Sequence, residues 1–171
     1  MIEVLIQMVQ ILMPAYLANA APTFLINYKK HVLDFGKKLG KNRVFGDGKT
    51  FEGLIFACFI GFLSGLLLTY VYYFLNLAWI NITPFGYAFI ALGAMIGDLV
   101  GSFIKRRLGM KRGQNAGLLD MLDFIIGALI FARILIDYSF WIMIISIIIT
   151  PIIHRLSNII GYEIGVKKEP W

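Results

Sequence analysis

The sequence predicts an all-α, polytopic integral membrane protein with five transmembrane helices in a single domain over residues 1–171. Of its 171 residues, 59% are hydrophobic and only 15% are charged, whereas soluble domains are typically about 45–50% apolar and about 25% charged. Five apolar stretches approach the length of about 20 residues that a membrane-spanning helix needs. We expect these helices at 2–26, 53–75, 84–104, 116–136 and 138–158.

The first stretch is the least regular of the five. Pro14 and Pro22 interrupt it, and Gln7, Gln10 and Asn19 add polar groups. Proline inside a helix removes a backbone hydrogen bond and bends the helix, and polar groups are costly where they face lipid. We expect a kinked helix that partly faces other protein segments. It is expected to be retained, because it has neither a basic leader nor a cleavage site.

The second and third stretches carry a small residue at every fourth position. One stripe consists of Gly53, Ala57, Gly61 and Gly65, and the other of Gly93, Gly97 and Gly101. Small residues at this spacing let two helix backbones approach closely in lipid. We expect the two stripes to pack together, which would bring the start of the second helix near the end of the third.

The distribution of basic residues predicts how the five helices are oriented across the membrane. These residues gather in the loops after the first and third stretches and near the C-terminus: Lys29, Lys30, Lys37, Lys38, Lys41, Arg43, Lys49, Lys105, Arg106, Arg107, Lys111, Arg112, Arg155, Lys167 and Lys168. Arg133 lies elsewhere, four residues before Asp137, which is a suitable partner on a helix. Because basic loops stay in the cytoplasm, we expect a multi-pass cell-membrane protein with its N-terminus outside and its C-terminus in the cytoplasm. The net charge of +6 then reflects this bias and lipid phosphates, and no nucleic acid.

A cluster of charged residues lies where the third and fourth stretches meet. Asp98, Ser102 and Lys105 are spaced i, i+4 and i+7 and therefore share one helix face. Asp120 and Asp123 project together from the start of the fourth stretch. Carboxylates bind Mg²⁺, which typically takes one or two of them together with substrate phosphates. We predict that the three aspartates hold Mg²⁺; the alternative is that the last two only cap the fourth helix.

The loop between these two helices mixes cations with glycines, which let backbone N–H groups approach a phosphate. We predict that Ser102, Lys111 and Asn115 bind substrate, and that Lys105 neutralises phosphate charge during catalysis. The alternative for the lysines is that they only anchor the helix at the membrane surface. The sequence motifs contain no nucleophilic side chain paired with a general base, so we expect no covalent enzyme intermediate.

The first basic loop ends in a glycine-rich turn that leads into the second helix. Gly46 and Gly48 precede Lys49, Thr50 and Glu52. Such a turn at a helix N-terminus suits a phosphate group, and we predict that the last three residues bind substrate. The alternative is an ordinary turn with a capping residue.

Together these motifs resemble the CDP-diacylglycerol synthases, or phosphatidate cytidylyltransferases. The similarity rests on Gly97-Asp98-Leu99, Ser102, Lys105-Arg106, Lys111 and the pair Asp120-x-x-Asp123. The chain departs from the bacterial pattern, because Arg112 replaces an acid, Met121 replaces an arginine and a His-Gly-Gly element is missing. The compact five-span chain, the GDGKTFEG turn and the C-terminal HRLSN segment are similar instead to the archaeal branch of this family.

The resemblance implies a membrane-embedded cytidylyltransferase domain over the whole chain. Its members transfer CMP from CTP to an unsaturated isoprenoid ether lipid phosphate (2,3-bis-O-geranylgeranyl-glycerol 1-phosphate) and release diphosphate, with Mg²⁺ as cofactor. The expected partners are CTP, this lipid phosphate and membrane lipids, and a homo-oligomer is compatible with the activity. The expected catalytic residues, on the cytoplasmic side, are Asp98, Lys105, Asp120 and Asp123.

Two other functions remain open. A CDP-alcohol phosphotransferase also uses paired acids in a membrane helix, but its motif continues with glycine, whereas Phe124 follows Asp123 here. A small-cation transporter would use the acids as an ion path. The acids gather at one side of the predicted membrane together with cations, which speaks against such a path.

Overall fold

The computed structural model describes residues 2–25, 31–77, 80–165 and 169. In this part of the chain, the main elements are α1 (Ile2–Ala20), α2 (Phe51–Phe74), α3 (Pro84–Arg107), α4 (Leu118–Leu135) and α5 (Phe140–Glu163). They match the five predicted helices in order, with α3 and α5 ending a few residues later than expected. The basic residues Lys29, Lys30, Lys167 and Lys168 lie outside the described residues.

Four helical segments are long and apolar enough to cross a membrane. They are Glu3–Leu25, Phe51–Phe74, Pro84–Arg107 and Phe140–Glu163. The shorter α4 does not qualify, because its 18 residues include Asp120, Asp123 and Arg133. Large apolar side chains such as Ile55 and Tyr73 on α2 are mostly exposed, as expected for helices whose outer faces meet lipid. The protein is therefore a multi-pass membrane protein, while the fifth crossing stays a prediction.

The ends of the helices are defined by local hydrogen bonds. Thr50, Thr83 and Ser139 precede α2, α3 and α5, and each side chain accepts a backbone N–H from the first turn. After α1, a 3₁₀ turn, η1 (Ala21–Leu25), contains Pro22, which ends the regular helix as proline typically does.

Buried polar side chains link the helices to one another. Gln10 of α1 is 1% exposed. Its amide binds the backbone C=O and N–H of Ile80 at 2.6 and 2.9 Å and the Tyr87 hydroxyl at 2.6 Å. The prediction that polar groups of the first helix face protein is thus confirmed at this residue.

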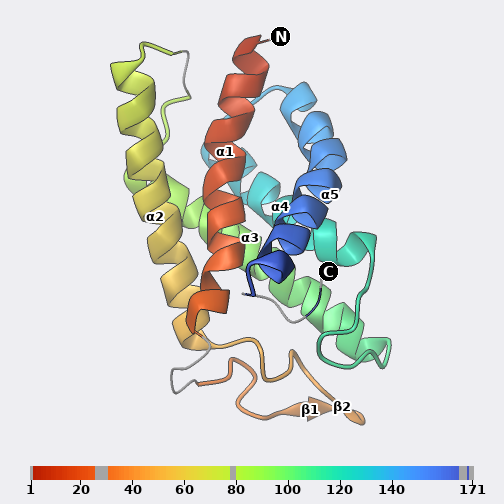
Figure 1. The fold of residues 1–171 in the computed structure, drawn as a ribbon. Helices are drawn as coiled ribbons and strands as arrows, with labels where there is room; N and C mark the ends of the chain where they lie inside the picture. Colours follow the sequence, from red (N-terminus) through yellow and green to blue (C-terminus); the bar gives the residue numbers. More distant parts are fainter. Residues whose placement is uncertain (1, 26–30, 78–79, 166–168, 170–171) are drawn as a thin grey trace.

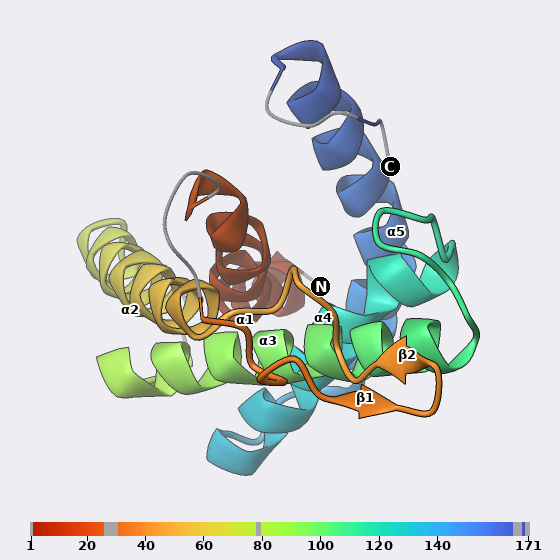
Figure 2. The same ribbon diagram turned by 90° about the horizontal axis from the view of Figure 1, so that it is seen from below.

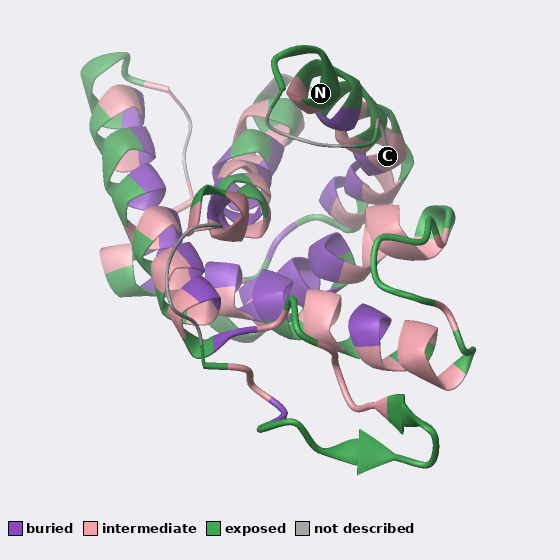
Figure 3. Cartoon of the chain, turned by 60° about the horizontal axis from the view of Figure 1, so that its bottom comes forward, coloured by how far each residue is buried: buried purple, intermediate pink, exposed green. Residues whose placement is uncertain are grey.

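The helices enclose two clusters of buried hydrophobic side chains. Figure 1 shows α1, α2 and α5 along the length of the molecule, with α3 crossing them obliquely. α3 contacts α1, α2 and α4, and α4 also contacts α1 and α5. The largest buried cluster joins Ile11, Tyr87, Ile90, Phe124 and Ile142. Figure 3 shows that the buried residues lie mainly on the stretches of helix that face other helices, and that the exposed residues lie mainly on the outer stretches and in the loops.

The second and third helices pack together as expected, with the start of α2 near Asp98 of α3, but the expected contact between their two small-residue stripes is wrong. The α2 stripe does face α3, but a Cβ added at Gly61 would lie 2.3 Å from the Ala91 Cβ, not near the α3 glycines. The α3 stripe faces α4 instead: a Cβ at Gly97 would lie 2.1 Å from the Asp123 carbonyl oxygen, and one at Gly127 2.2 Å from the Gly93 oxygen. Glycine thus brings α3 and α4 into backbone contact.

The first loop contains a small hairpin that the all-α prediction did not include. Strands β1 (Lys38–Leu39) and β2 (Asn42–Arg43) pair antiparallel. The Arg107 guanidinium at the end of α3 donates to the carbonyls of Leu39, Asn42 and Arg43, and the Asn42 amide donates to the Arg106 carbonyl at 2.9 Å. The hairpin therefore lies against the C-terminal end of α3 (Figure 2).

Candidate active site

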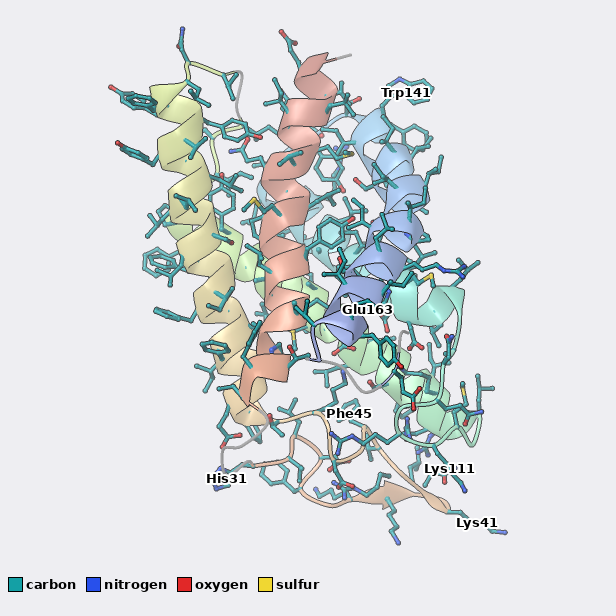
Figure 4. The ribbon with its side chains drawn as sticks, in the orientation of Figure 1. His31, Lys41, Phe45, Lys111, Trp141 and Glu163 are labelled. Carbon is teal, nitrogen blue, oxygen red and sulfur yellow. The ribbon has the colours of Figure 1, made fainter. Side chains whose placement is uncertain are left out.

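Two polar cavities lie at the hairpin end of the molecule, where Figure 4 labels Phe45 and Lys111. The larger polar cavity has a volume of about 300 Å³ and lies between η1, the start of α2 and α3. The smaller polar cavity, about 180 Å³, lies between the glycine turn and the last turns of α3. Gly48, Lys49 and Arg112 line both. The two cavities thus form one polar region.

Residues of α3 enter this region as their spacing predicts. Asp98 lines the larger polar cavity, and Ser102 and Lys105 line the smaller one. The Lys49 ammonium donates to the Asp98 carboxylate. Each of the two side chains is less than one quarter exposed, so the ion pair is shielded from water. Ser102 is 3% exposed.

The paired acids of α4 differ in their surroundings. Asp120 accepts from the Lys105 ammonium with one oxygen and from the Ala116 N–H, at 2.7 Å, with the other. The Ala116 N–H lies just before α4, so this hydrogen bond is the one expected if Asp120 caps the helix. The contact with Lys105 is not explained by capping. The Oδ1 of Asp123 accepts a hydrogen bond from the Phe124 N–H at 2.6 Å, while its Oδ2 is buried without a hydrogen-bond partner.

The Asp123 carboxylate lies against α3. A Cβ at Gly101 would be 2.0 Å from its Oδ2, so the glycine leaves the room that the carboxylate occupies. Asp98, Lys49 and Lys105 are close enough to interact with it electrostatically. The structure therefore brings the three predicted aspartates and two of the predicted lysines into one group.

One oxygen of this group is free to bind a divalent cation. Among the described residues, no three His, Cys, Asp or Glu side chains converge on one point, but Mg²⁺ needs only one or two carboxylates when phosphates complete its shell. A buried carboxylate oxygen without a partner is costly. The unpaired Oδ2 of Asp123 is an acceptor of the kind such a cation requires.

The other predicted residues of the glycine turn fall into two classes. Thr50 caps α2 through the Gly53 N–H at 3.2 Å and also lines the larger polar cavity. Glu52 faces the other way, because it accepts the His31 backbone N–H at 2.9 and 3.1 Å and lies 2.5 Å from its ring Nδ1. Glu52 is not among the residues that line either cavity.

The loop after α3 places Arg112 where Lys111 was predicted. Lys111 and Asn115 are exposed; the first donates its backbone N–H to Gln114, and the second accepts the Gly117 N–H at 2.7 Å. Neither lines either of the two polar cavities, whereas Arg112 lines both. The sequence pattern holds no signal that separates the two neighbouring cations, because the choice depends on the backbone of the loop.

Asp34 lies behind the glycine turn and was not among the predicted site residues. It is 5% exposed and pairs with Arg43. The Arg43 guanidinium and several backbone N–H groups hold the pKa of this carboxyl well below its ordinary value. A lone acid in a basic loop gives no sequence signal that it will be buried.

An apolar cavity of about 390 Å³ lies beside the polar region, between α1, η1, α4 and α5. Phe24, Phe124 and Ile160 contribute to its walls. Asn19 and Thr23 line both this cavity and the larger polar cavity. Polar and apolar spaces therefore adjoin at η1.

A family model described as CarS-like CDP-archaeol synthase matches residues 1–171. The chain belongs to this family. The CDP-archaeol synthase of Pyrobaculum calidifontis is 39% identical over 169 residues, which cover 98% of each chain. That of Methanosarcina barkeri is 39% identical over 178 aligned residues, covering 94% of this chain and 100% of the relative. The resemblance to the archaeal branch that the motifs indicated is thus confirmed.

The fold is also similar to that of a solved membrane enzyme. That structure is described as an intramembrane enzyme for archaeal membrane lipids biosynthesis; it is 35% identical, with a TM-score of 0.75. The match covers 88% of this chain and 92% of the other. This member of the CDP-archaeol synthase family therefore shares its helical arrangement with a solved intramembrane enzyme.

Proposed function

We propose that this protein transfers CMP from CTP to an isoprenoid ether lipid phosphate, giving CDP-archaeol and diphosphate. Membership of the CDP-archaeol synthase family supports the reaction class. The structural observation that carries the proposal is the group of three aspartates and two lysines beside polar cavities that adjoin an apolar one. A reaction between a nucleotide and a lipid requires such a junction of polar and apolar spaces.

The chemistry asks for orientation and charge neutralisation. An oxygen of the lipid phosphate forms a bond to the α-phosphorus of CTP, and the bond from that phosphorus to the bridging oxygen breaks. The diphosphate leaves with the electron pair. Because the lipid phosphate is already an anionic nucleophile, no strong base is needed. Holding two anions in line and stabilising the leaving charge supply most of the catalysis.

The two ion pairs suggest how the site accepts its substrates. Lys49 holds Asp98, and Lys105 holds Asp120, so the acids carry compensated charge at the membrane boundary. We infer that the phosphates of CTP compete for the two lysines and free the carboxylates. Because no three acids of the described residues converge on one point, Asp123 together with Asp98 or Asp120, once these are freed from their lysines, would hold Mg²⁺ with the CTP phosphates completing its shell. A bound divalent cation supplies positive charge to the triphosphate and to the leaving diphosphate.

The lipid is proposed to reach the site from the side. The apolar cavity between α1, α4 and α5 shares Asn19 and Thr23 with the larger polar cavity. A lipid phosphate could therefore approach the α-phosphate while its isoprenoid chains stay in an apolar setting. The five crossings, with the site on the cytoplasmic side where CTP is available, belong to the same proposal.

A purified-protein assay tests this function. The protein in detergent or lipid is incubated with CTP, MgCl₂ and either an isoprenoid ether lipid phosphate or a diacyl lipid phosphate. We expect the CDP-lipid and diphosphate in equal amounts, and none when EDTA replaces MgCl₂. Failure to form product with either lipid would overturn the proposal. Release of CMP from a supplied CDP-lipid in the presence of an alcohol would indicate a phosphotransferase instead.

A further inference from the structure

Asp34 lies buried behind the glycine turn, and its carboxylate is fully used. The side chain has no exposed surface. Oδ2 accepts the Arg43 Nε and the backbone N–H groups of Phe45 and Gly46, each at 3.1 Å. Oδ1 accepts the second Arg43 nitrogen and the Gly36 N–H, the latter at 3.1 Å. One carboxylate thus ties the hairpin to the first residues of the turn.

The same segment also fixes the far end of the turn. The N–H of Leu33, next to Asp34, donates to the Lys49 carbonyl at 2.9 Å, and the Lys49 N–H donates to the Gly46 carbonyl at 3.3 Å. The turn from Gly46 to Lys49 is therefore held at both ends by the segment Leu33–Asp34. Its middle and end, Gly48 and Lys49, line both polar cavities.

Arg43 joins the two sides of this arrangement. Its guanidinium binds Asp34 at two points and donates through Nη1 to Asp47, at 2.6 Å, within the turn. Two-point binding of a carboxylate by arginine fixes direction as well as distance. The pairing with Arg43 also neutralises the Asp34 carboxylate, which would otherwise repel phosphate groups in the adjoining cavities.

We propose that Asp34 is a positioning residue for the nucleotide: with Arg43 it sets the Gly46–Lys49 turn so that Lys49 reaches Asp98 and the triphosphate of CTP. This inference rests on the proposed function. The lipid is expected to bind on the opposite side of η1, in contact with residues that Asp34 does not hold. The effect of Asp34 should therefore fall on CTP and spare the lipid, whereas a residue that only stabilises the fold would affect both substrates alike.

The test replaces Asp34 with asparagine. Asn has the same size, but its amide nitrogen cannot accept hydrogen bonds from Arg43 or from backbone N–H groups. The dissociation constant of CTP is measured by titration in MgCl₂, and the KM of the lipid phosphate by CMP transfer. We expect the CTP dissociation constant to rise about tenfold, because charge-assisted hydrogen bonds are lost, with an unchanged KM for the lipid.

The matched control is Asp137→Asn. Asp137 also pairs with an arginine, Arg133, but is 90% exposed and lies in the connection between α4 and α5. This variant should bind CTP and lipid as the wild type does. Thermal unfolding of all variants measures the contribution of each pair to the fold.

An unchanged CTP affinity of Asp34→Asn, or an equal loss for CTP and lipid, overturns the positioning role. Should this variant not fold, Arg43→Lys keeps both charges but removes the two-point contact, and the same split between CTP and lipid is expected on a smaller scale. The proposed function fails separately, if the wild type forms no CDP-lipid. A wild type that transfers CMP while Asp34→Asn binds CTP normally refutes only the role of Asp34.

Discussion

Lys105 lies near the membrane boundary and at the candidate site, so it could either anchor α3 at the membrane surface or bind substrate. Its side chain is 15% exposed and its ammonium donates to Asp120. A cation that only anchored a helix would extend toward water or lipid head groups. Its inward direction, beside Ser102 in the smaller polar cavity, favours a role in substrate binding.

Replacing Lys105 with alanine tests this role. We expect the rate of CMP transfer to fall by about 100-fold, in line with the loss of one charged group that stabilises the transition state. The KM for CTP should rise at the same time. Kinetics of the purified variant measure both. Lys41→Ala is the control, because Lys41 is exposed in the turn of the hairpin. Wild-type kinetics for Lys105→Ala would leave the residue as a membrane anchor.

The Asp34 carboxyl gives a prediction about pH. Arg43 and backbone N–H groups lower its pKa in the folded protein. A lowered pKa contributes stability that is fully present above the unfolded value, about 4, and is lost as the pH falls further. We expect the gap in unfolding temperature between the wild type and Asp34→Asn to be constant from pH 8 to 5 and to shrink below about pH 4. Shrinkage already between pH 8 and 6 would contradict this.

The contact between α3 and α4 decides where the acids stand, and it is built from glycine. Gly93, Gly97 and Gly101 of α3 lie against Gly127 and Asp123 of α4. In lipid, such close approach replaces the hydrophobic effect as a source of helix association. The same glycines therefore serve packing and the placement of the Asp123 carboxylate.

Gly101→Ala tests both tasks at one position. The added methyl would lie 2.0 Å from the Asp123 Oδ2 and 2.9 Å from the Asp123 Cβ, so the carboxylate must move and the close contact between α3 and α4 must loosen. We expect at least a tenfold loss of CMP transfer and a destabilisation of about 1–3 kcal/mol, as for other overpacked sites. Transfer kinetics and thermal unfolding measure the two effects. Val100→Ala, at an exposed neighbour on the same helix, should change neither, and full activity of Gly101→Ala would refute the placement.

The positions of the helices could be predicted from the sequence, but their partners could not. Long apolar stretches and capping residues such as Thr50 and Thr83 mark where helices lie. The glycine stripe of α3 indicates a close neighbour without saying which helix it is. The hairpin at Lys38–Leu39 and Asn42–Arg43 escaped prediction because two-residue strands are too short to show an alternating pattern.

The same limit applies to the candidate site. Helical spacing correctly grouped Asp98, Ser102 and Lys105, because side chains four and seven residues apart share a face. In loops no such rule exists. Substrate binding by Lys111 stays a prediction, while the positions of Arg112 at both polar cavities and of the buried Asp34 could not be predicted. Their positions depend on tertiary contacts with the turn and with Arg43.

At the scale of the whole molecule, charge and hydropathy are arranged along one direction. The hairpin, the glycine turn and the loop after α3 lie at one end (Figure 4), and Trp141 lies toward the other. The described basic residues of these loops, among them Lys41 and Arg112, are exposed or partly exposed at that end. This asymmetry is what the positive-inside rule associates with the cytoplasmic side.

Cysteine labelling in intact cells tests the orientation. The native Cys58 is first replaced by alanine, and a single cysteine is then introduced at Lys41 or at Asp137, both of which are exposed. We expect a membrane-impermeant maleimide to label the Asp137→Cys protein and to label Lys41→Cys only after the cells are opened, because basic loops stay inside. The reverse pattern would invert the topology.

The central claim is that the buried Asp123 carboxylate belongs to a site for nucleotide transfer. The most direct measurement is the rate of CMP transfer by purified Asp123→Asn, which keeps the size of the side chain and removes its charge. We predict a loss of at least about 100-fold, with thermal unfolding showing an intact fold, while Asp137→Asn retains the wild-type rate. A near-wild-type rate for Asp123→Asn would contradict the account.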